Sequence, residues 1–266
     1  MTISPNATLY IALALYAVGT LHALASLFRT APALQRAGLF AMIAGFVSHT
    51  IWIGTICTIT GHPPLTNLAE AAGFLSWTVF LVELILFVRY RVYAASFFVY
   101  PLVLILLTIS AVVREPFQRV TPLMRSRIFT AHILLTTLGI AGLLIGLAFM
   151  ALATMQDRSL RSKTRGRLWE WIPSLNVCKV VSYRSLATGF SVYTLGIIAG
   201  VLWSYRINAG PMELRIKQVG AVVAWILFAV LLQSAMTGVF RGRKTLLVSA
   251  GALVAIIVAI LGIHHG

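Results

Sequence analysis

The chain has 266 residues, of which 59% are hydrophobic and only 10% are charged, and its formal net charge is +15. Soluble domains carry about 25% charged residues, and a soluble chain of this size could not bury so much apolar surface. The composition therefore excludes a water-soluble globular protein. Together with a mean hydropathy of +0.93, it predicts an integral membrane protein.

Eight apolar segments are long enough to cross a membrane as helices, since a crossing needs about 20 residues. In chain order they cover residues 8–28, 37–60, 68–88, 95–113, 128–154, 186–205, 216–240 and 245–263. None shows the period-two alternation of a β-barrel strand, and the first is too long for a cleaved signal peptide. The sequence predicts an all-α bundle of about eight transmembrane helices, forming one polytopic membrane domain over residues 1–266.

Lysine and arginine are distributed unequally between the two sets of connectors. The odd-numbered connectors carry 14 basic residues, seven of them in the basic inner loop predicted over 156–185, and the even-numbered connectors carry seven. Because cytoplasmic loops are enriched in Lys and Arg, this pattern predicts that both termini lie outside. It also assigns the positive charge to orientation and to contact with anionic membrane lipid, so we expect no nucleic-acid partner.

The two cysteines, Cys57 and Cys178, form neither a CxxC nor a CxxCH motif. The chain therefore lacks the motif for covalent attachment of a c-type heme. It also has no disulfide framework, because the predicted topology places the two thiols near opposite faces of the membrane.

The predicted topology places four of the six histidines at or near the outer surface and two at mid-depth in the spans. The outer four are His62, His132, His264 and His265, and the inner two are His22 and His49. A polar residue inside a span is expensive and is by default a functional-site hypothesis. A neutral imidazole can ligate heme iron or form an interhelical hydrogen bond, and the residues alone leave both interpretations open.

Two further interpretations of the polar residues remain at this point. From the residues alone, the final His264 and His265 are a chain tail. Paired histidines would also serve a proton-coupled transporter of small solutes, in which Glu83, deep in the third span, acts with His22 and His49.

The segment GHPPLTNLAEAAGFLSW, residues 61–77, interrupts the apolar pattern with turn-forming and polar residues. Its two prolines stop helical continuation. Thr66 or Asn67 can cap the next helix, which places Glu70 at N3 or N4 near the positive end of the helix dipole. One interpretation is a capped re-entry into the membrane, and the other is a wall of an outer chamber or a partner surface.

Four segments resemble the cytochrome c assembly proteins, the CcsA family with its HemX-like relatives. The segment over 61–77 is similar to the family's GHxPLSNLYExxxFLSW, with Asn67, Glu70 and Trp77 on its asparagine, glutamate and tryptophan. The other three matches are VVSYRSLATGFSVYTLGIIAGVLW (180–203) with LSYRxxxxGFPxLTxGIxxGAxW, FRGRK (240–244) with WRGRR, and TAHILLTTLGIAGLLIG (130–146) with HVxxxxLSYAALxxA.

This resemblance implies a multi-pass protein of the cell inner (cytoplasmic) membrane that handles heme during cytochrome c assembly. It implies that a non-covalent heme b is ligated near the outer face by His132 and His264, the latter at the position of the family's terminal histidine. His49 matches a further family histidine in the second span. Under this resemblance, a frayed tail is the weaker interpretation of His264.

The resemblance also implies two partners, heme itself and a separate membrane protein with a large outer domain. The outer segment would meet one of them. The residues that we expect to make this contact are His62, Asn67, Glu70 and Trp77.

The chain departs from the family pattern in two places. Residues 208–218, NAGPMELRIKQ, lack the three tryptophans and the aspartate of the family loop WGSYWSWDPKE, and Gln233 replaces a family histidine. Asn, Met and Leu cannot reproduce an indole platform that packs on a porphyrin, while His22 is a candidate replacement for the lost histidine. These departures favour an accessory or heme-delivery role without catalytic residues over a complete lyase. They leave a HemX-like membrane regulator of heme biosynthesis as the alternative.

Overall fold

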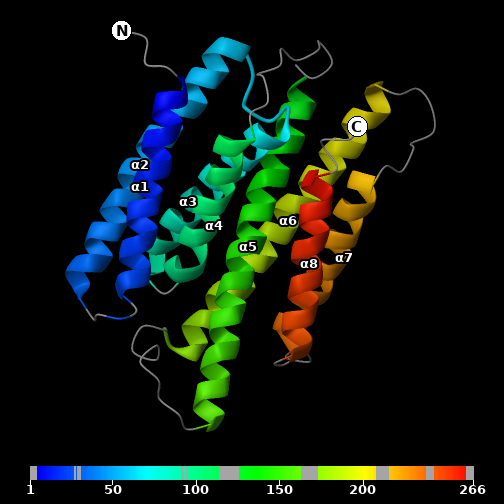
Figure 1. The fold of residues 1–266 in the computed structure, drawn as a ribbon. Coiled ribbons are helices and arrows are strands. Elements are labelled where there is room, and N and C mark those ends of the chain that lie inside the picture. Colours follow the sequence, from blue (N-terminus) through cyan, green and yellow to red (C-terminus); the bar gives the residue numbers. More distant parts are fainter. Residues whose placement is uncertain are drawn as a thin grey trace. The chain divides into compact units, whose positions relative to one another are not determined.

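The computed structural model describes residues 5–26, 28, 31–90, 93, 95–113, 126–162, 173–207, 216–237 and 243–261. Within these ranges the chain forms eight α-helices and no strand, which confirms the all-α fold class (Figure 1). The helices are α1 (Pro5–Ser26), α2 (Pro32–Thr60), α3 (Leu68–Tyr90), α4 (Ser96–Val112), α5 (Arg127–Ser162), α6 (Leu175–Ile207), α7 (Ile216–Thr237) and α8 (Arg243–Leu261).

Six of these helices, namely α1, α2, α3, α5, α6 and α7, are long and apolar enough to cross a membrane, so the protein is a multi-pass membrane protein. α4 has 17 residues, which gives about 26 Å at about 1.5 Å per residue, the lower end of the length that crosses the hydrocarbon. In α8, the apolar stretch Leu247–Ala259 is shorter than the six candidate spans. The side of the membrane on which the termini lie stays a prediction.

The two longest helices extend beyond the apolar runs that predicted them. α5 continues to Ser162 and α6 begins at Leu175, so the segment predicted as a basic loop over 156–185 is helical at both ends. In the last turns of α5, the Arg161 guanidinium pairs with the Asp157 carboxylate at 2.9 Å, an i,i+4 pair that stabilises exposed helix. Charged helical turns carry no hydropathy signal. The prediction from apolar runs therefore ends the fifth helix too early and begins the sixth helix too late.

The helices group into two compact units. The first unit contains α1 to α4, and the second contains α5 to α8. Each unit packs around its own set of helix contacts. The single membrane domain expected over 1–266 therefore stays a prediction.

In the first unit, α1 lies along α2, and α4 packs against α1 and α3 (Figure 1). A glycine permits the close approach of α1 and α2, because a Cβ built on Gly45 would lie 2.6 Å from Cδ1 of Tyr16. The Ser48 hydroxyl donates a hydrogen bond to the Thr8 carbonyl oxygen at 2.9 Å. Small residues and buried hydroxyl bonds of this kind hold helices together where the hydrophobic effect between helices is absent.

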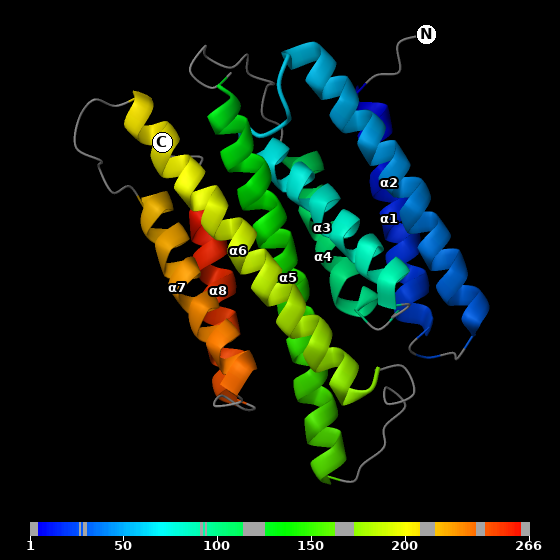
Figure 2. The ribbon, with the colours of Figure 1, turned by 180° about the vertical axis from the view of Figure 1, so that it is seen from behind.

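The second unit is built on the α5–α6 pair, whose helices lie side by side (Figure 2). Their backbones touch, since a Cβ on Gly142 would lie 3.1 Å from Cα of Gly189, and a Cβ on Gly189 would lie 2.7 Å from the Leu143 nitrogen. The Ser182 hydroxyl donates to the Gly146 carbonyl oxygen at 2.9 Å. This close pair positions the site that is described below.

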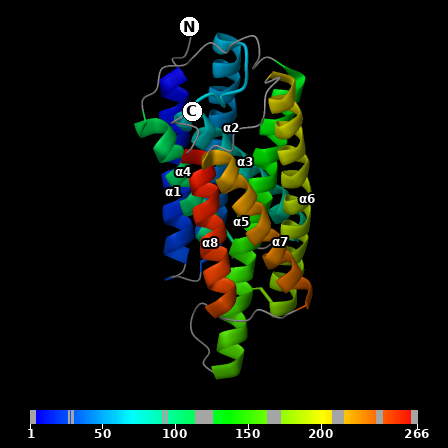
Figure 3. The same ribbon diagram turned by 90° about the vertical axis from the view of Figure 1, so that its right-hand side faces the viewer.

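α7 packs on both α6 and α8 (Figure 3). The Trp225 indole nitrogen donates to the Thr194 hydroxyl oxygen at 2.9 Å, which connects α7 to α6. A Cβ on Gly220 would lie 3.0 Å from the Ala259 nitrogen, so glycine permits the close α7–α8 contact.

Candidate functional site

His132 lies near the start of α5, and its imidazole packs against α6 in the second unit. Nδ1 is 2.7 Å from the Gly196 carbonyl oxygen. A Cβ built on Gly200, one turn further along α6, would lie 2.6 Å from both Nδ1 and Cε1 of the ring. Glycine at 200 therefore provides the space that the imidazole occupies against the neighbouring helix.

The hydrogen bond to Gly196 determines which ring nitrogen of His132 carries the proton. A carbonyl oxygen can only accept, so Nδ1 donates, and the lone pair of Nε2 is left available to a ligand. Metal-ligating histidines commonly have this arrangement, with one ring nitrogen donating to a carbonyl and the other binding the metal. Thr136 adds to it, because its hydroxyl donates to the His132 carbonyl oxygen and also lies 3.3 Å from Nδ1.

An aromatic pair lies one helical turn from His132. Phe129 precedes His132 by three residues, so the two share a face of α5. Its ring contacts Trp203 of α6, with centroids 4.7 Å apart and planes inclined by 43°. Aromatic side chains of this kind can pack against a planar ligand, so this end of the α5–α6 pair offers an imidazole nitrogen beside an aromatic surface.

The sequence identified His132 but not Phe129, Gly196 or Gly200 as residues of this site. The signals were present, since Gly196 and Gly200 form the small-xxx-small pattern of a close helix pair and Phe129 is one turn from His132. Neither signal names the partner helix, and His132 and Gly196 are 64 residues apart in the chain.

The second predicted iron ligand, His264, lies outside the described residues, as do residues 208–215 of the altered loop. The pairing of His132 with His264 therefore stays a prediction. Gln233, which replaces a family histidine, is exposed on α7, and its carbonyl oxygen accepts the Thr237 hydroxyl at 2.9 Å.

His49 is completely buried in the first unit and is surrounded by aromatic side chains. Its Nδ1 lies 3.4 Å from the Tyr16 hydroxyl, and its ring contacts the Trp52 ring with centroids 5.6 Å apart. Within the described chain, Nε2 of His49 has no hydrogen-bond partner of normal geometry. The residue is thus a buried imidazole that links α1 to α2, with one nitrogen still unsatisfied.

His22 does not lie beside His49. Its Nδ1 donates to the Val18 carbonyl oxygen of its own helix at 2.8 Å. Its Cβ faces Gly38, where a built Cβ would lie 3.1 Å away, and Gly38 is about 16 Å from His49 along α2 at about 1.5 Å per residue. The structure therefore does not form the His22–His49 pair that a shared heme or a direct proton relay would need.

The outer segment forms a hydrogen-bonded cap at the start of α3. Asn67 Oδ1 accepts the Glu70 backbone N–H at 2.8 Å, so Asn67 is the N-cap and Glu70 is at N3. Glu70 Oε2 accepts both the backbone N–H and the hydroxyl of Thr66, each at 2.8 Å. Gly61, with φ of 76°, ends α2 in the left-handed conformation that glycine adopts freely. The capped re-entry is thus present in the structure.

The other two residues predicted for this segment are held against neighbouring groups. The Trp77 indole nitrogen donates to the Thr50 hydroxyl oxygen at 2.8 Å, and the indole stacks on Phe46 with centroids 5.2 Å apart. The buried His62 has Nδ1 2.7 Å from the Pro63 carbonyl oxygen. Trp77 therefore attaches α3 to α2, and His62 stabilises the turn.

Two polar atoms of the cap have no hydrogen-bond partner among the described residues, namely Glu70 Oε1 and Asn67 Nδ2. Both side chains are buried, with 1% of Glu70 and 6% of Asn67 exposed. Buried polar atoms are normally hydrogen-bonded, so these are the two atoms of the cap that a further group could satisfy.

Fold and site together define a class of protein: a multi-pass helical membrane protein that presents an imidazole nitrogen beside aromatic side chains at one end of a close helix pair. The family model described as Cytochrome C assembly protein matches residues 65–265 of the chain. The matched region includes most of the outer segment and all of α5 and α6. The chain belongs to this family, which confirms the resemblance found in the sequence.

Several relatives of the chain are named cytochrome c biogenesis protein CcsA. The relative from Guillardia theta is 26% identical over 246 residues, covering 85% of this chain and 82% of the relative. That from Prochlorococcus marinus (strain MIT 9301) is 25% identical over 230 residues, covering 78% and 74%. That from Nicotiana tomentosiformis is 25% identical over 244 residues, covering 81% and 76%. These names support CcsA-like membership, and the HemX-like affiliation stays a prediction.

Proposed function

We propose that this chain is a heme-handling protein of cytochrome c assembly in the cell inner membrane, with His132 as an axial ligand of a non-covalent heme b. The observation that carries the proposal is the hydrogen bond from His132 Nδ1 to the Gly196 carbonyl oxygen, which leaves Nε2 available. The names of the CcsA relatives support a role in cytochrome c assembly. His264 is the proposed second ligand.

The residues that the structure describes fit a heme. Imidazole nitrogen is a common axial ligand of heme iron, and the Phe129–Trp203 pair supplies aromatic surface one turn away. In this role His132 fixes the position of the iron, while Gly196 fixes the tautomer of His132. A bound heme supplies a redox-active iron, and in an assembly protein the heme is also the cargo.

The altered loop favours delivery or accessory work over complete lyase chemistry. Residues 208–218 contain no tryptophan, so a bound porphyrin would lack the indole platform of the family loop. We assign no catalytic residue. The outer segment, with its unsatisfied Glu70 Oε1 and Asn67 Nδ2, is the proposed contact with heme or with a separate membrane partner that has a large outer domain.

The same loop is the observation that favours a second candidate function. A chain that has lost the platform and has Gln233 in place of a histidine could act as a HemX-like membrane regulator that binds partners and little heme. The third candidate, a proton-coupled transporter, loses support because His22 faces Gly38 rather than His49.

The test is the absorption spectrum of the protein purified in detergent, before and after addition of heme. We expect a Soret band and, on reduction, the sharp α band of six-coordinate heme. His132→Ala should lower heme retention, and added imidazole should partly restore it. His22→Ala is the matched control, because the hydrogen bond of its ring lies within α1, and it should leave the spectrum unchanged. Folded protein with no visible absorbance after addition of heme would exclude the heme proposal and leave the regulator.

A further inference from the structure

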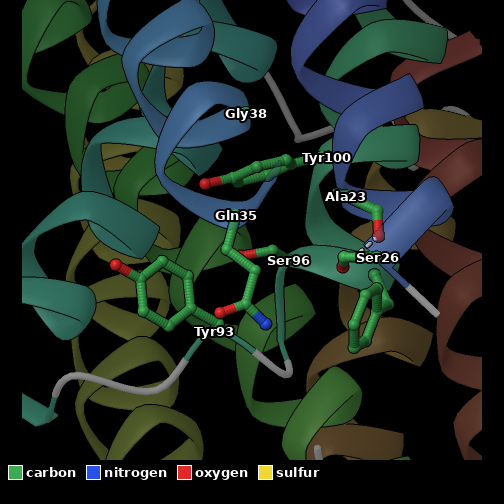
Figure 4. Close-up of a pocket in the computed structure, with 8 residues that line it drawn as sticks. Ala23, Ser26, Gln35, Gly38, Tyr93, Ser96 and Tyr100 are labelled. Carbon is green, nitrogen blue, oxygen red and sulfur yellow. Dashed lines mark hydrogen bonds between the residues drawn. The ribbon is translucent and has the colours of Figure 1, made fainter. Parts of the chain in front are cut away.

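A small polar cavity in the first unit is too small for a heme. It lies where α1 ends and α2 and α4 begin, and side chains such as Gln35 and Tyr100 line it (Figure 4). It has room for about one water-sized sphere, whereas a porphyrin is many times larger. This cavity therefore cannot receive a heme, and the candidate site stays at the His132 end of the α5–α6 pair.

The start of α5 and the end of α6 lie at the same end of this pair. His132, near the start of α5, contacts Gly196 in the second half of α6. Ser182, near the start of α6, bonds to Gly146 further along α5. The two helices are therefore antiparallel, and the last turns of α6 continue past His132 toward the beginning of α5.

Three residues of α6 follow one another at intervals of three toward this end, namely Gly200, Trp203 and Arg206. Gly200 leaves the space that the His132 ring occupies, Trp203 contacts the Phe129 ring, and Arg206 lies in the last turn of the helix. Residues three apart are neighbours on a helix surface, and each interval advances about 4.5 Å along the axis. An imidazole, an aromatic surface and a guanidinium therefore follow in that order toward the end of α6.

The guanidinium of Arg206 has no carboxylate partner in the described part of the chain. Arg206 is exposed, and the ion pair formed within the described residues is Arg161 with Asp157, in the last turns of α5 at its opposite end. The other described acidic residues, Glu70 and Glu83, belong to α3 in the first unit. A guanidinium presents a fork of N–H donors that fits a carboxylate. Arg206 thus offers a cation to an anionic group from outside the described chain.

We propose that Arg206 binds the propionate carboxylates of a heme whose iron is ligated by His132, an inference that rests on the proposed function. A heme has its iron at the centre, a flat aromatic ring around the iron, and two carboxylates on one edge. The α5–α6 pair presents the complementary side chains in the same order. Arg206 therefore determines which edge of the porphyrin faces the end of α6, and the contact is a charge-assisted hydrogen bond.

Arg127 is the matched comparison for Arg206. It is the first residue of α5 and is exposed, so it places the same charge at the same end of the pair. Arg127 precedes Phe129 by two residues, and residues two apart do not share a face of a helix. General attraction of an anion would involve both arginines, whereas a contact with the propionates of a heme beside the aromatic pair involves Arg206.

The test compares heme with heme dimethyl ester, in which both propionates are methylated and carry no charge. Each is titrated into the detergent-purified protein, and the Soret band reports binding. Relative to wild type, Arg206→Gln should lower the ratio of heme affinity to ester affinity about fivefold, as expected for an exposed ion pair. Arg127→Gln should leave this ratio unchanged. In the wild-type protein, added salt should weaken binding of heme and not of the ester, a measurement that needs no variant.

His132→Ala distinguishes failure of this inference from failure of the proposed function. It should lower the affinity for both ligands, because both contain the iron. If His132→Ala does so while Arg206→Gln leaves the ratio unchanged, Arg206 is not the carboxylate partner and the heme proposal stands. The same conclusion follows if Arg127→Gln changes the ratio as much as Arg206→Gln does. A folded wild-type protein that binds neither ligand would overturn both proposals.

Discussion

The imidazole of His132 occupies space that only a glycine at position 200 leaves open. A Cβ on Gly200 would lie 2.6 Å from Nδ1 and Cε1 of the ring, closer than such atoms normally approach. Nδ1 of the same ring is also 2.7 Å from the carbonyl oxygen of Gly196, one turn earlier on α6. The orientation of the proposed ligand is therefore set by two backbone positions of α6.

Gly200→Ala should displace the His132 ring and weaken heme binding without removing the ligand. Residues that orient a metal ligand typically change metal affinity by about 10–100-fold, so we expect a loss of at least about tenfold. The measurement is heme titration of the detergent-purified protein. Gly54→Ala is the control, since a Cβ at Gly54 meets nothing within 4 Å. Equal heme affinity in the two variants would show that the ring does not need this space.

Two substitutions of Asn67, the residue that caps α3, distinguish a structural role of its side chain from a role in binding a partner. Asn67→Ala removes the acceptor for the Glu70 N–H and should lower the free energy of unfolding by about 1 kcal/mol. Asn67→Asp keeps an acceptor but loses the Nδ2 donor, which has no partner among the described residues. It should preserve thermal stability in detergent and still weaken a complex with heme or a partner protein. If Asn67→Asp behaves as wild type in both assays, the free amide has no binding role.

The contact between Gly189 and α5 should be more sensitive to added volume than open glycine positions. A Cβ at Gly189 would lie 2.7 Å from the Leu143 nitrogen, and backbone atoms cannot move aside as a flexible side chain can. Overpacking of this kind costs about 1–3 kcal/mol, so Gly189→Ala should lower the midpoint of thermal unfolding. Gly54→Ala, again the control, should be neutral or slightly stabilising because alanine favours helix. A neutral Gly189→Ala would mean that α5 and α6 are farther apart than described.

Local features of this protein could be predicted from the sequence. The helices follow from apolar runs, since each backbone polar group in a membrane must be satisfied within its own segment. The cap is also a local feature: the sequence allows either Thr66 or Asn67 as the capping residue, and in the structure it is Asn67, with Glu70 at N3. The spacing of capping residues carries this information without knowledge of the fold.

Contacts between distant segments could not be predicted in the same way. The pattern around His132 does not reveal that Gly196 accepts its proton 64 residues away. The depths of His22 and His49 gave no sign that His22 faces Gly38, because depth does not specify the face of a helix.

The orientation in the membrane rests on 14 basic residues on one set of connectors against seven on the other. We expect a reporter that is active only outside the cell membrane to be active when fused after Gly266. The same reporter inserted within 164–166 should be silent, because the rule for positive charge retains that connector inside. The reverse pattern would place the His132 end of the α5–α6 pair in the other compartment and exclude an outer heme site.

The last prediction concerns residues 208–218, where the family's tryptophans are missing. An axial imidazole fixes the iron, but a stacked indole also fixes the porphyrin plane and its vinyl edge. Attachment to a thiol needs that edge held at about 3–3.5 Å, so a loosely held porphyrin can be bound and still be unreactive.

We therefore expect the unmodified chain to fail to replace a complete family member in a cytochrome c maturation assay, even with His132 and His264 intact. Grafting the tryptophan-rich sequence onto 208–218 should raise heme retention more than Gln233→His does, because the graft restores a surface and Gln233→His adds only one ligand atom. A graft of equal length without aromatic residues is the control for loop replacement itself. Maturation at full rate by the unmodified chain would show that the platform is dispensable, and the accessory or delivery role would then be wrong.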